Sequence, residues 1–163
     1  ARVLADHFQN NTMIDTIVCL DGTELIGAFM AEFLTDTGIM SINSGKNISI
    51  ITPDVNAYGQ LVFMDSTLRM IKNMQVLVLA ASVTTGQTIT RAAEAVSYYG
   101  GTVRGVAAIF SNVEQTEEGM EIFSIFQKED LPDYQAYLPA ECPMCRKKMP
   151  IDAIVNSFGY SKL

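Results

Sequence analysis

The sequence predicts an α/β fold in which a mainly parallel sheet carries helices on both faces. Short apolar runs alternate along the chain with segments whose apolar residues recur at helical spacing. The apolar runs are nearly continuous, as is typical of strands buried on both sides in a parallel sheet. A length of 163 residues with 48% hydrophobic content suits a single domain over residues 1–163, in which residues 132–163 form a C-terminal tail.

The first forty residues predict a helix, a strand and a second helix. Residues 3–9 have the pattern of a helix end, and residues 14–20 form an almost continuous apolar run that predicts a buried strand. From Thr23 onward, apolar side chains recur at helical spacing, and Gly38 is the expected stop. The apolar positions are Leu25, Ile26, Phe29, Met30, Phe33 and Leu34.

The next segment predicts short elements separated by turns. The polar cluster 43–47 is typical of a turn, and residues 48–51 predict a strand that ends at Pro53. Residues 61–64 predict another short strand, and residues 66–71 predict one or two helical turns.

The second half predicts the order strand, loop, helix, strand, strand. Residues 76–79 predict a strand, and residues 82–87 a polar turn. The helix that follows is expected to end at the glycine pair 100–101. Its apolar face comprises Ile89, Ala92, Ala93, Val96 and Tyr99. Strands are expected at 103–110 and 122–126.

Composition favours a soluble, cytoplasmic protein with no affinity for nucleic acid or membrane. The net charge of −7 disfavours binding to polyanions, and we interpret the basic run 146–148 as a solvated turn. No apolar run approaches the roughly 20 residues that cross a bilayer. Three cysteines without a secretion signal suit a reducing compartment. The chain begins at Ala1 without methionine, which suggests that upstream residues are missing.

The loop between the 76–79 strand and the next helix has the makings of a phosphate site. Free N–H groups and the helix dipole favour an anion at a helix start. Gly86 permits close backbone approach, and the hydroxyls of Thr84, Thr85 and Thr88 can donate to phosphate oxygens. The alternative is an ordinary turn with Thr88 as the N-cap.

Residues 76–89, VLVLAASVTTGQTI, resemble the phosphoribosyl pyrophosphate motif of the type I phosphoribosyltransferases, and of the orotate phosphoribosyltransferases in particular. Residues 15–34 resemble that family's first core strand, pyrophosphate loop and following helix. Residues 100–114 resemble the strand after the motif helix. Cys142 and Cys145 stand in a tail similar to that of some orotate phosphoribosyltransferase-like proteins.

The resemblance implies a Rossmann-like homodimer that transfers phosphoribosyl from phosphoribosyl pyrophosphate to a nucleobase such as orotate. Pyrophosphate is released, normally with the help of magnesium. By resemblance, the 5′-phosphate site comprises Ser82, Thr84, Thr85, Gly86, Gln87 and Thr88. The pyrophosphate loop comprises Asp21, Gly22, Thr23 and Glu24.

The motif is degenerate. The family's paired acids, which hold the ribose hydroxyls and help to organise the metal, fall on Ala80 and Ala81. Charge-assisted hydrogen bonds contribute about 1.5 to 3 kcal/mol each, so losing two costs about 3 to 6 kcal/mol. Asp21 and Glu24 have no basic neighbour, and we interpret them as solvated loop acids rather than metal ligands. Neither Lys46 nor Lys72 aligns with the lysine of the orotate enzymes' mobile loop, which lies between the two halves of the sheet.

Two functions therefore compete. One is a working phosphoribosyltransferase with altered substrate contacts. The other is a catalytically inactive regulatory protein of the same fold that binds a nucleotide or another phosphorylated ligand. A purely structural role without a ligand is a third alternative. The catalytic residues themselves are not identifiable from the sequence.

The remaining reactive side chains receive separate interpretations. Cys142 and Cys145 have the spacing of two zinc ligands, which a second copy of the chain would complete, and the alternatives are a plain surface loop or a redox pair. Cys19 is expected in the core, and His7 on the surface or in packing. For Tyr134 and Tyr137, packing is favoured over stacking on a base.

Overall fold

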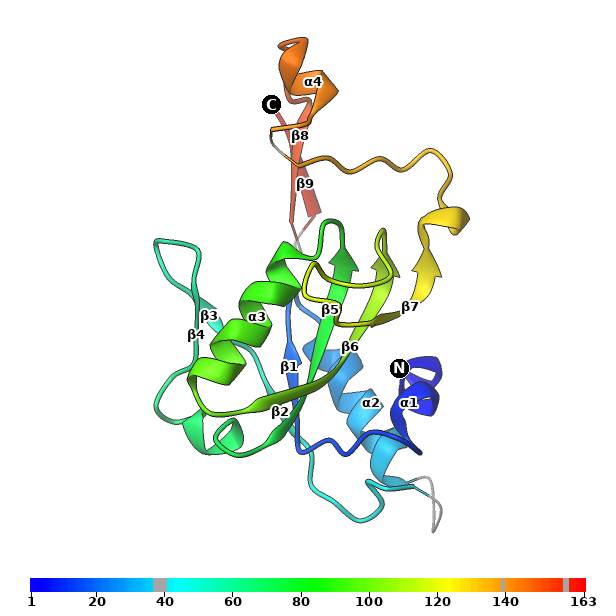
Figure 1. The fold of residues 1–163 in the computed structure, drawn as a ribbon, viewed down its shortest axis with the longest axis vertical. Helices are drawn as coiled ribbons and strands as arrows, with labels where there is room; N and C mark the ends of the chain where they lie inside the picture. Colours follow the sequence, from blue (N-terminus) through cyan, green and yellow to red (C-terminus); the bar gives the residue numbers. More distant parts are fainter. Residues whose placement is uncertain (37–40, 139, 157–158) are drawn as a thin grey trace.

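A five-stranded parallel sheet forms the centre of the computed structural model, which describes residues 1–36, 41–138, 140–156 and 159–163 (Figure 1). The strand order is β2-β1-β5-β6-β7, and every neighbouring pair is parallel. The strands are β1 (Thr16–Cys19), β2 (Ser49–Ile51), β5 (Gln75–Val83), β6 (Thr102–Ser111) and β7 (Ile122–Gln127). The predicted parallel α/β sheet is confirmed.

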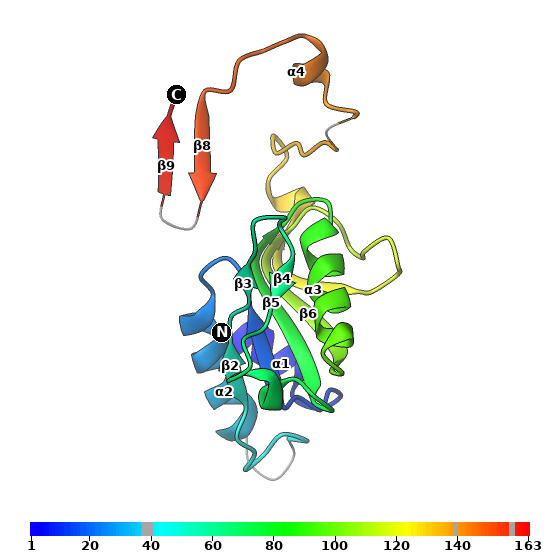
Figure 2. The ribbon, with the colours of Figure 1, turned by 90° about the vertical axis from the view of Figure 1, so that its left-hand side faces the viewer.

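Helices cover both faces of the sheet, as predicted (Figure 2). The helices α1 (Arg2–Phe8) and α2 (Glu24–Asp36) pack on one face, where they meet Ile17 and Leu77. The helix α3 (Gln87–Tyr98) packs on the other face, against Val18 and Val78. Successive strand residues point to opposite faces, so each central strand contributes side chains to the hydrophobic clusters on both faces of the sheet. The expected stop of α2 at Gly38 lies outside the described residues.

The helix α3 ends as the glycine pair predicts. Gly100 adopts a φ of 82°, and its N–H donates to the Ser97 carbonyl at 2.9 Å. The N–H of Gly101 donates to the Val96 carbonyl at 2.9 Å. These two bonds are the signature of a Schellman motif, which satisfies carbonyls that the last helical turn leaves open.

The strand β5 is longer than the sequence predicts. Ser82 and Val83, which we expected in the polar turn, continue the strand and pair with Phe110 and Ser111 of β6. The long neighbouring strand offers ladder partners to these residues, and this tertiary pairing overrides their local preference.

The segment between β2 and β5 holds a small hairpin instead of another sheet strand. The strands β3 (Asp54–Val55) and β4 (Leu61–Val62) pair only with each other, in antiparallel order. The short 3-10 helix η2 (Leu68–Met70) follows, where one or two helical turns were expected.

The C-terminal tail contains more regular structure than the sequence indicated. After η3 (Lys128–Asp130), the chain forms the short helix α4 (Pro143–Arg146) and an antiparallel hairpin of β8 (Ala153–Asn156) and β9 (Gly159–Lys162). Both views place this tail beyond the carboxyl-terminal edge of the sheet (Figures 1 and 2). Among the described helices, none combines the length and the apolar character needed to span a bilayer.

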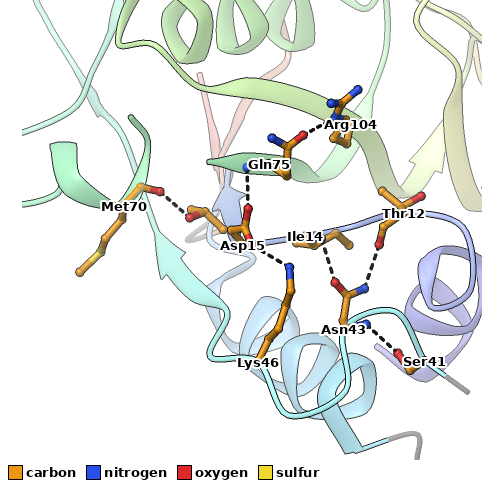
Figure 3. A network of polar contacts seen from close by, with 10 residues as sticks. Thr12, Ile14, Asp15, Ser41, Asn43, Lys46, Met70, Gln75 and Arg104 are labelled. Atoms are coloured by element: carbon orange, nitrogen blue, oxygen red, sulfur yellow. Dashed lines mark hydrogen bonds and ion pairs between the residues drawn. The ribbon is translucent and has the colours of Figure 1, made fainter. Parts of the chain in front are cut away.

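A buried asparagine organises the opposite, amino-terminal edge of the sheet (Figure 3). The side chain of Asn43 accepts a hydrogen bond from the Ile14 N–H at 2.9 Å and donates one to the Thr12 carbonyl at 2.8 Å. Asn43 is fully buried, so these bonds offset the cost of placing its amide in the interior.

Asp15 ties two strands together at the same edge (Figure 3). Its carboxylate accepts from the Gln75 N–H at 3.0 Å and contacts the Lys46 ammonium at 2.9 Å. Partial burial pushes the pKa of Asp15 upward, but the Gln75 hydrogen bond and the Lys46 charge outweigh it, so the pKa is lowered. The ionised carboxylate therefore stabilises the start of β1 against β5.

We expect Asp15→Asn to lower the free energy of unfolding by about 1 kcal/mol at pH 7 in urea denaturation. Because the folded-state pKa is depressed, the contribution is present above the unfolded pKa of about 3.9 and is lost as pH falls through the folded value. The two proteins should therefore converge in acid. Asp54→Asn, at an exposed carboxylate in β3, is the control; an equal loss there would contradict this account.

Candidate functional site

Two loops meet where the strand order of the sheet reverses. From β1 the chain passes outward to β2 and then returns to β5 on the other side of β1. In open α/β sheets, ligands bind outside the carboxyl ends of the strands at such a switch point. Here β1 ends at Cys19, which pairs with Leu79, whereas β5 continues to Val83 before its loop begins. These loops line a cavity of about 30 Å³ formed by Asp21, Ala80 and residues 82–89.

The amino terminus of α3 lacks a side-chain cap. Gly86 is the N-cap, with a φ of 82°, and the first bond into the helix runs from the Thr90 N–H to the Gly86 carbonyl at 3.0 Å. The N–H groups of the first helical turn therefore have no acceptor within the helix. The alternative with Thr88 as N-cap is wrong, because Thr88 lies inside the first turn.

The hydroxyls around this terminus are also free of protein partners. Within the described chain, the side chains of Ser82, Thr84 and Thr88 are exposed, and neither they nor the half-buried Thr85 form a hydrogen bond to protein. The loop is held by its backbone instead. Asn112, just after β6, donates its side-chain amide to the Thr84 carbonyl at 3.2 Å. The predicted phosphate-loop residues thus come together with donors available to an anion.

The loop after β1 is held by a buried threonine. The Thr23 hydroxyl lies 2.8 Å from the carbonyl of Leu20, directly after β1, and 3.1 Å from the carbonyl of Leu79, within β5. Asp21 and Gly22 both adopt positive φ, of 56° and 78°. Sequence reasoning placed Thr23 beside the ligand, but its hydroxyl is directed into the protein. Thr23 is a positioning residue for the loop.

The two acids of this loop have different surroundings. Asp21 lines the cavity, and desolvation raises the pKa of its carboxyl even though the side chain reaches solvent. Glu24 is exposed and accepts from the Thr52 hydroxyl, just after β2, at 2.9 Å. Among the described residues, no group of three or more histidine, cysteine and acidic side chains is placed to hold a metal ion.

The alanines that replace the family's acids occupy the end of β5. Ala80 is 1% exposed, packs into the core beneath α3 and borders the cavity, while Ala81 is half-buried. Lys46 lies at the amino-terminal edge with Asp15, and Lys72 lies beside Gly100, at the end of α3 opposite the loop. Neither lysine reaches the site.

Arg91 is the cation that sequence reasoning missed. It lies in the second turn of α3 and lines a hollow of about 270 Å³ together with Thr85 and Glu117. Glu118 lies nearby, where the Thr90 hydroxyl donates to its carboxylate at 2.8 Å and lowers its pKa. Its sequence position could have indicated this place. Arg91 lies five residues after Gly86, and side chains in the first two turns of a helix lie close to the loop that precedes it.

The other predicted residues lie away from this crevice. His7 stacks on Phe123 with ring centroids 3.8 Å apart, and Tyr134 packs edge-on against Phe110 at 4.9 Å, so both packing interpretations are confirmed. Tyr137 is partly exposed, and its hydroxyl donates to Gln135. Cys19 is fully buried as expected, and burial raises the pKa of its thiol to about 11.

Cys142 and Cys145 lie at the start of α4 in the tail. The Cys145 N–H donates to the Cys142 sulfur at 3.3 Å. That hydrogen bond is the main reason that the pKa of Cys142 is lowered, whereas its contact with Cys142 raises the pKa of Cys145. The exposed 146–148 run is confirmed as a surface turn, with Lys148 at a φ of 54°.

Comparison with solved structures identifies the class of fold. The structure superposes on a purine phosphoribosyltransferase from Pyrococcus horikoshii with a TM-score of 0.54 and 15% identity, over 83% of this chain and 88% of that one. Adenine phosphoribosyltransferase from Trypanosoma brucei gives 0.53 and 15% identity, over 90% and 73% of the two chains. Orotate phosphoribosyltransferase from Aeropyrum pernix gives 0.50 and 18%, over 82% and 76%. The chain therefore has the type I phosphoribosyltransferase fold.

Within that class, the sequence resembles an orotate phosphoribosyltransferase. An alignment of 83 residues is 35% identical to orotate phosphoribosyltransferase of Chlorobaculum parvum, and it covers 48% of this chain. It spans only 39% of that relative's length. No protein-family model matches the chain.

We expect Thr23→Val to lower the free energy of unfolding by about 1 kcal/mol, because it removes a hydroxyl shared by two buried carbonyls. Thr52→Val removes an exposed hydroxyl at the same edge and should cost under about 0.5 kcal/mol. Urea unfolding monitored by circular dichroism measures both. Equal losses in the two variants would contradict the positioning role of Thr23.

Proposed function

We propose that this protein binds the phosphate group of a nucleotide or phosphorylated sugar at residues 84–88 and no longer transfers phosphoribosyl. The observation that carries the proposal is the uncapped terminus of α3, beside exposed hydroxyls that have no partner in the described protein. A helix start with open N–H groups favours an anion both through hydrogen bonds and through the dipole.

The likeness to solved phosphoribosyltransferases supports this class of ligand. The Trypanosoma brucei adenine phosphoribosyltransferase was crystallised in complex with AMP, pyrophosphate and ribose 5-phosphate. Each of these ligands carries phosphate. In this chain the crevice between β1 and β5 presents donors to a phosphate group and the methyl group of Ala80, and Ala81 follows Ala80 in β5.

Loss of catalysis follows from the charges at the site. Magnesium and the ribose hydroxyls need carboxylate or other oxygen ligands, and the methyl groups of Ala80 and Ala81 provide none. Asp21 is the acid that lines the cavity, and its desolvated carboxylate opposes an anion. The ligand is therefore expected to bind without magnesium.

A working transferase is the second candidate function. It is favoured by the 35% identity to an orotate phosphoribosyltransferase. It requires magnesium bound through Asp21 or the ligand itself, a nucleobase such as orotate as acceptor, and the homodimer that the resemblance implies.

Calorimetric titration separates the two candidates. Phosphoribosyl pyrophosphate, ribose 5-phosphate and a nucleoside monophosphate are titrated with and without magnesium, and pyrophosphate release is assayed after orotate, uracil or a purine base is added. Binding that is independent of magnesium, without pyrophosphate release, supports the proposal. Turnover with any base supports the transferase. Absence of binding by all three ligands contradicts both.

The loop hydroxyls are tested by Thr84→Val and Thr88→Val. Each removes a donor to a charged oxygen, so ribose 5-phosphate affinity should fall about tenfold per substitution. Thr102→Val, which removes an exposed hydroxyl at the opposite edge of the sheet, is the matched control. Unchanged affinity in both loop variants would exclude this loop as the phosphate site.

We expect Asp21→Asn to tighten the binding of inorganic phosphate about fivefold at pH 7.5, because a like charge is removed from the cavity. Asparagine tolerates the positive φ of this position, so the backbone is retained. Because the pKa of Asp21 is raised, the advantage of the variant should shrink as pH falls toward that pKa. Weaker binding by the variant in magnesium buffer would instead make Asp21 a metal ligand and favour the transferase.

A further inference from the structure

The cysteine pair of the tail forms a close, accessible dithiol. Cys142 precedes the first turn of α4 and Cys145 lies within it, so one turn of backbone separates their sulfurs. The Cys145 N–H donates to the Cys142 sulfur at 3.3 Å. Cys142 is half-buried and Cys145 is exposed.

The backbone around the pair is held in a tight turn. Pro143 occupies the first position of α4, and the Arg146 N–H donates to the Cys142 carbonyl at 3.1 Å. The Lys148 N–H donates to the Cys145 carbonyl at 3.0 Å. Side chains three residues apart on such a turn have Cβ atoms about 5 to 6 Å apart. A disulfide needs about 3.5 to 4.5 Å, so a small closing movement suffices.

Three cations directly follow the pair in the sequence, and one acid, Glu141, directly precedes it. The Arg146 guanidinium is anchored near Cys142 by a hydrogen bond to the Ala140 carbonyl at 3.4 Å. Lys147 and Lys148 follow and are exposed. The single ion pair found in the described part of the chain is Lys46 with Asp15, at the far edge of the sheet, so these three charges are not neutralised by a salt bridge. An anionic reactant is favoured here.

We propose that Cys142 and Cys145 form a thiol–disulfide exchange site whose substrate is an anionic low-molecular-weight disulfide such as glutathione disulfide. Cys142 is assigned as the attacking sulfur, because a backbone N–H and the Arg146 charge stabilise its thiolate. Cys145 is assigned as the resolving thiol.

The exchange proceeds in two balanced steps. The Cys142 thiolate attacks one sulfur of the disulfide, which forms a mixed disulfide and releases one glutathione thiolate. Cys145 then loses its proton to solvent and attacks the Cys142 sulfur. This step forms the Cys142–Cys145 disulfide and releases the second glutathione. The two protein thiols lose two electrons, and the glutathione disulfide gains them.

Thiol–disulfide exchange requires only the two thiols of this tail, whereas a zinc site requires further ligands. Tetrahedral zinc takes four ligands, and the pair supplies two. Within the described residues, no third cysteine, histidine or acid is grouped with them as a metal site. The pair is therefore complete as a redox unit and half complete as a zinc site.

The experiment equilibrates the full chain with a series of ratios of reduced to oxidised glutathione, quenches with acid, alkylates free thiols and maps them by mass spectrometry. We expect a reversible loss of two hydrogens confined to the peptide that contains Cys142 and Cys145. The buried Cys19 should remain reduced throughout and serves as the internal control.

Single variants assign the roles. Cys145→Ser should accumulate glutathione on Cys142, and Cys142→Ser should accumulate it on Cys145 at least about tenfold more slowly. At low salt, the wild-type pair should react several-fold faster with glutathione disulfide than with the cationic disulfide cystamine. Both substitutions are in the tail, and circular dichroism of each variant serves as the control that the central sheet is retained.

Four results would overturn the proposal: a pair that stays reduced in oxidised glutathione, equal trapping in the two variants, a disulfide that links two chains, or purified protein holding one zinc per two chains on these thiols. Equal rates with the anionic and cationic disulfides would remove the assigned substrate class. None of these outcomes bears on the phosphate loop, so failure here is distinguishable from failure of the proposed function.

Discussion

The parallel pairing of β1 with β5 is the constraint on which the rest of the structure depends. It is held at both ends by side chains outside the ladder. At the amino edge the Asp15 carboxylate accepts from the Gln75 N–H, and at the carboxyl edge the Thr23 hydroxyl bonds the carbonyls of Leu20 and Leu79. Because a shift of one residue would turn every side chain to the opposite face, these contacts preserve both cores and the position of the loop after β1 relative to β5.

The same pairing separates the charges of the molecule. Lys46 and Lys72 lie at the amino edge, whereas Asp21 and Glu24 lie at the carboxyl edge, the edge of residues 84–88. At the cavity that Asp21 lines, an anion would be held mainly by N–H and hydroxyl dipoles, because Arg91 lines the neighbouring hollow instead. Such dipoles are strong at a helix start but are local. The site therefore suits a single phosphate group better than a pyrophosphate with several charges.

Much of the fold could be predicted because it depends on residue patterns within short segments of the sequence. Continuous apolar runs indicated the buried strands, and the glycine pair 100–101 indicated the end of α3. The extension of β5 through Val83 depends on the length of β6. The burial of the Thr23 hydroxyl depends on the position of the Leu79 carbonyl, to which it donates. Those features arise from residues distant in sequence, so local pattern could not reveal them. For the same reason the resemblance placed Thr23 in the pyrophosphate loop without indicating that its hydroxyl bonds to the sheet.

The chain also separates what maintains the fold from what performs the chemistry. Ala80 is 1% exposed and packs beneath α3, where a carboxylate would carry a desolvation cost. A methyl group at this position avoids that desolvation cost, which a functional carboxylate would have to offset. The N–H groups at the start of α3, by contrast, belong to the backbone and persist while the strand, loop and helix fold. The backbone donors at the start of α3 therefore depend on the fold alone, whereas carboxylate ligands at the end of β5 would depend on the particular side chains there.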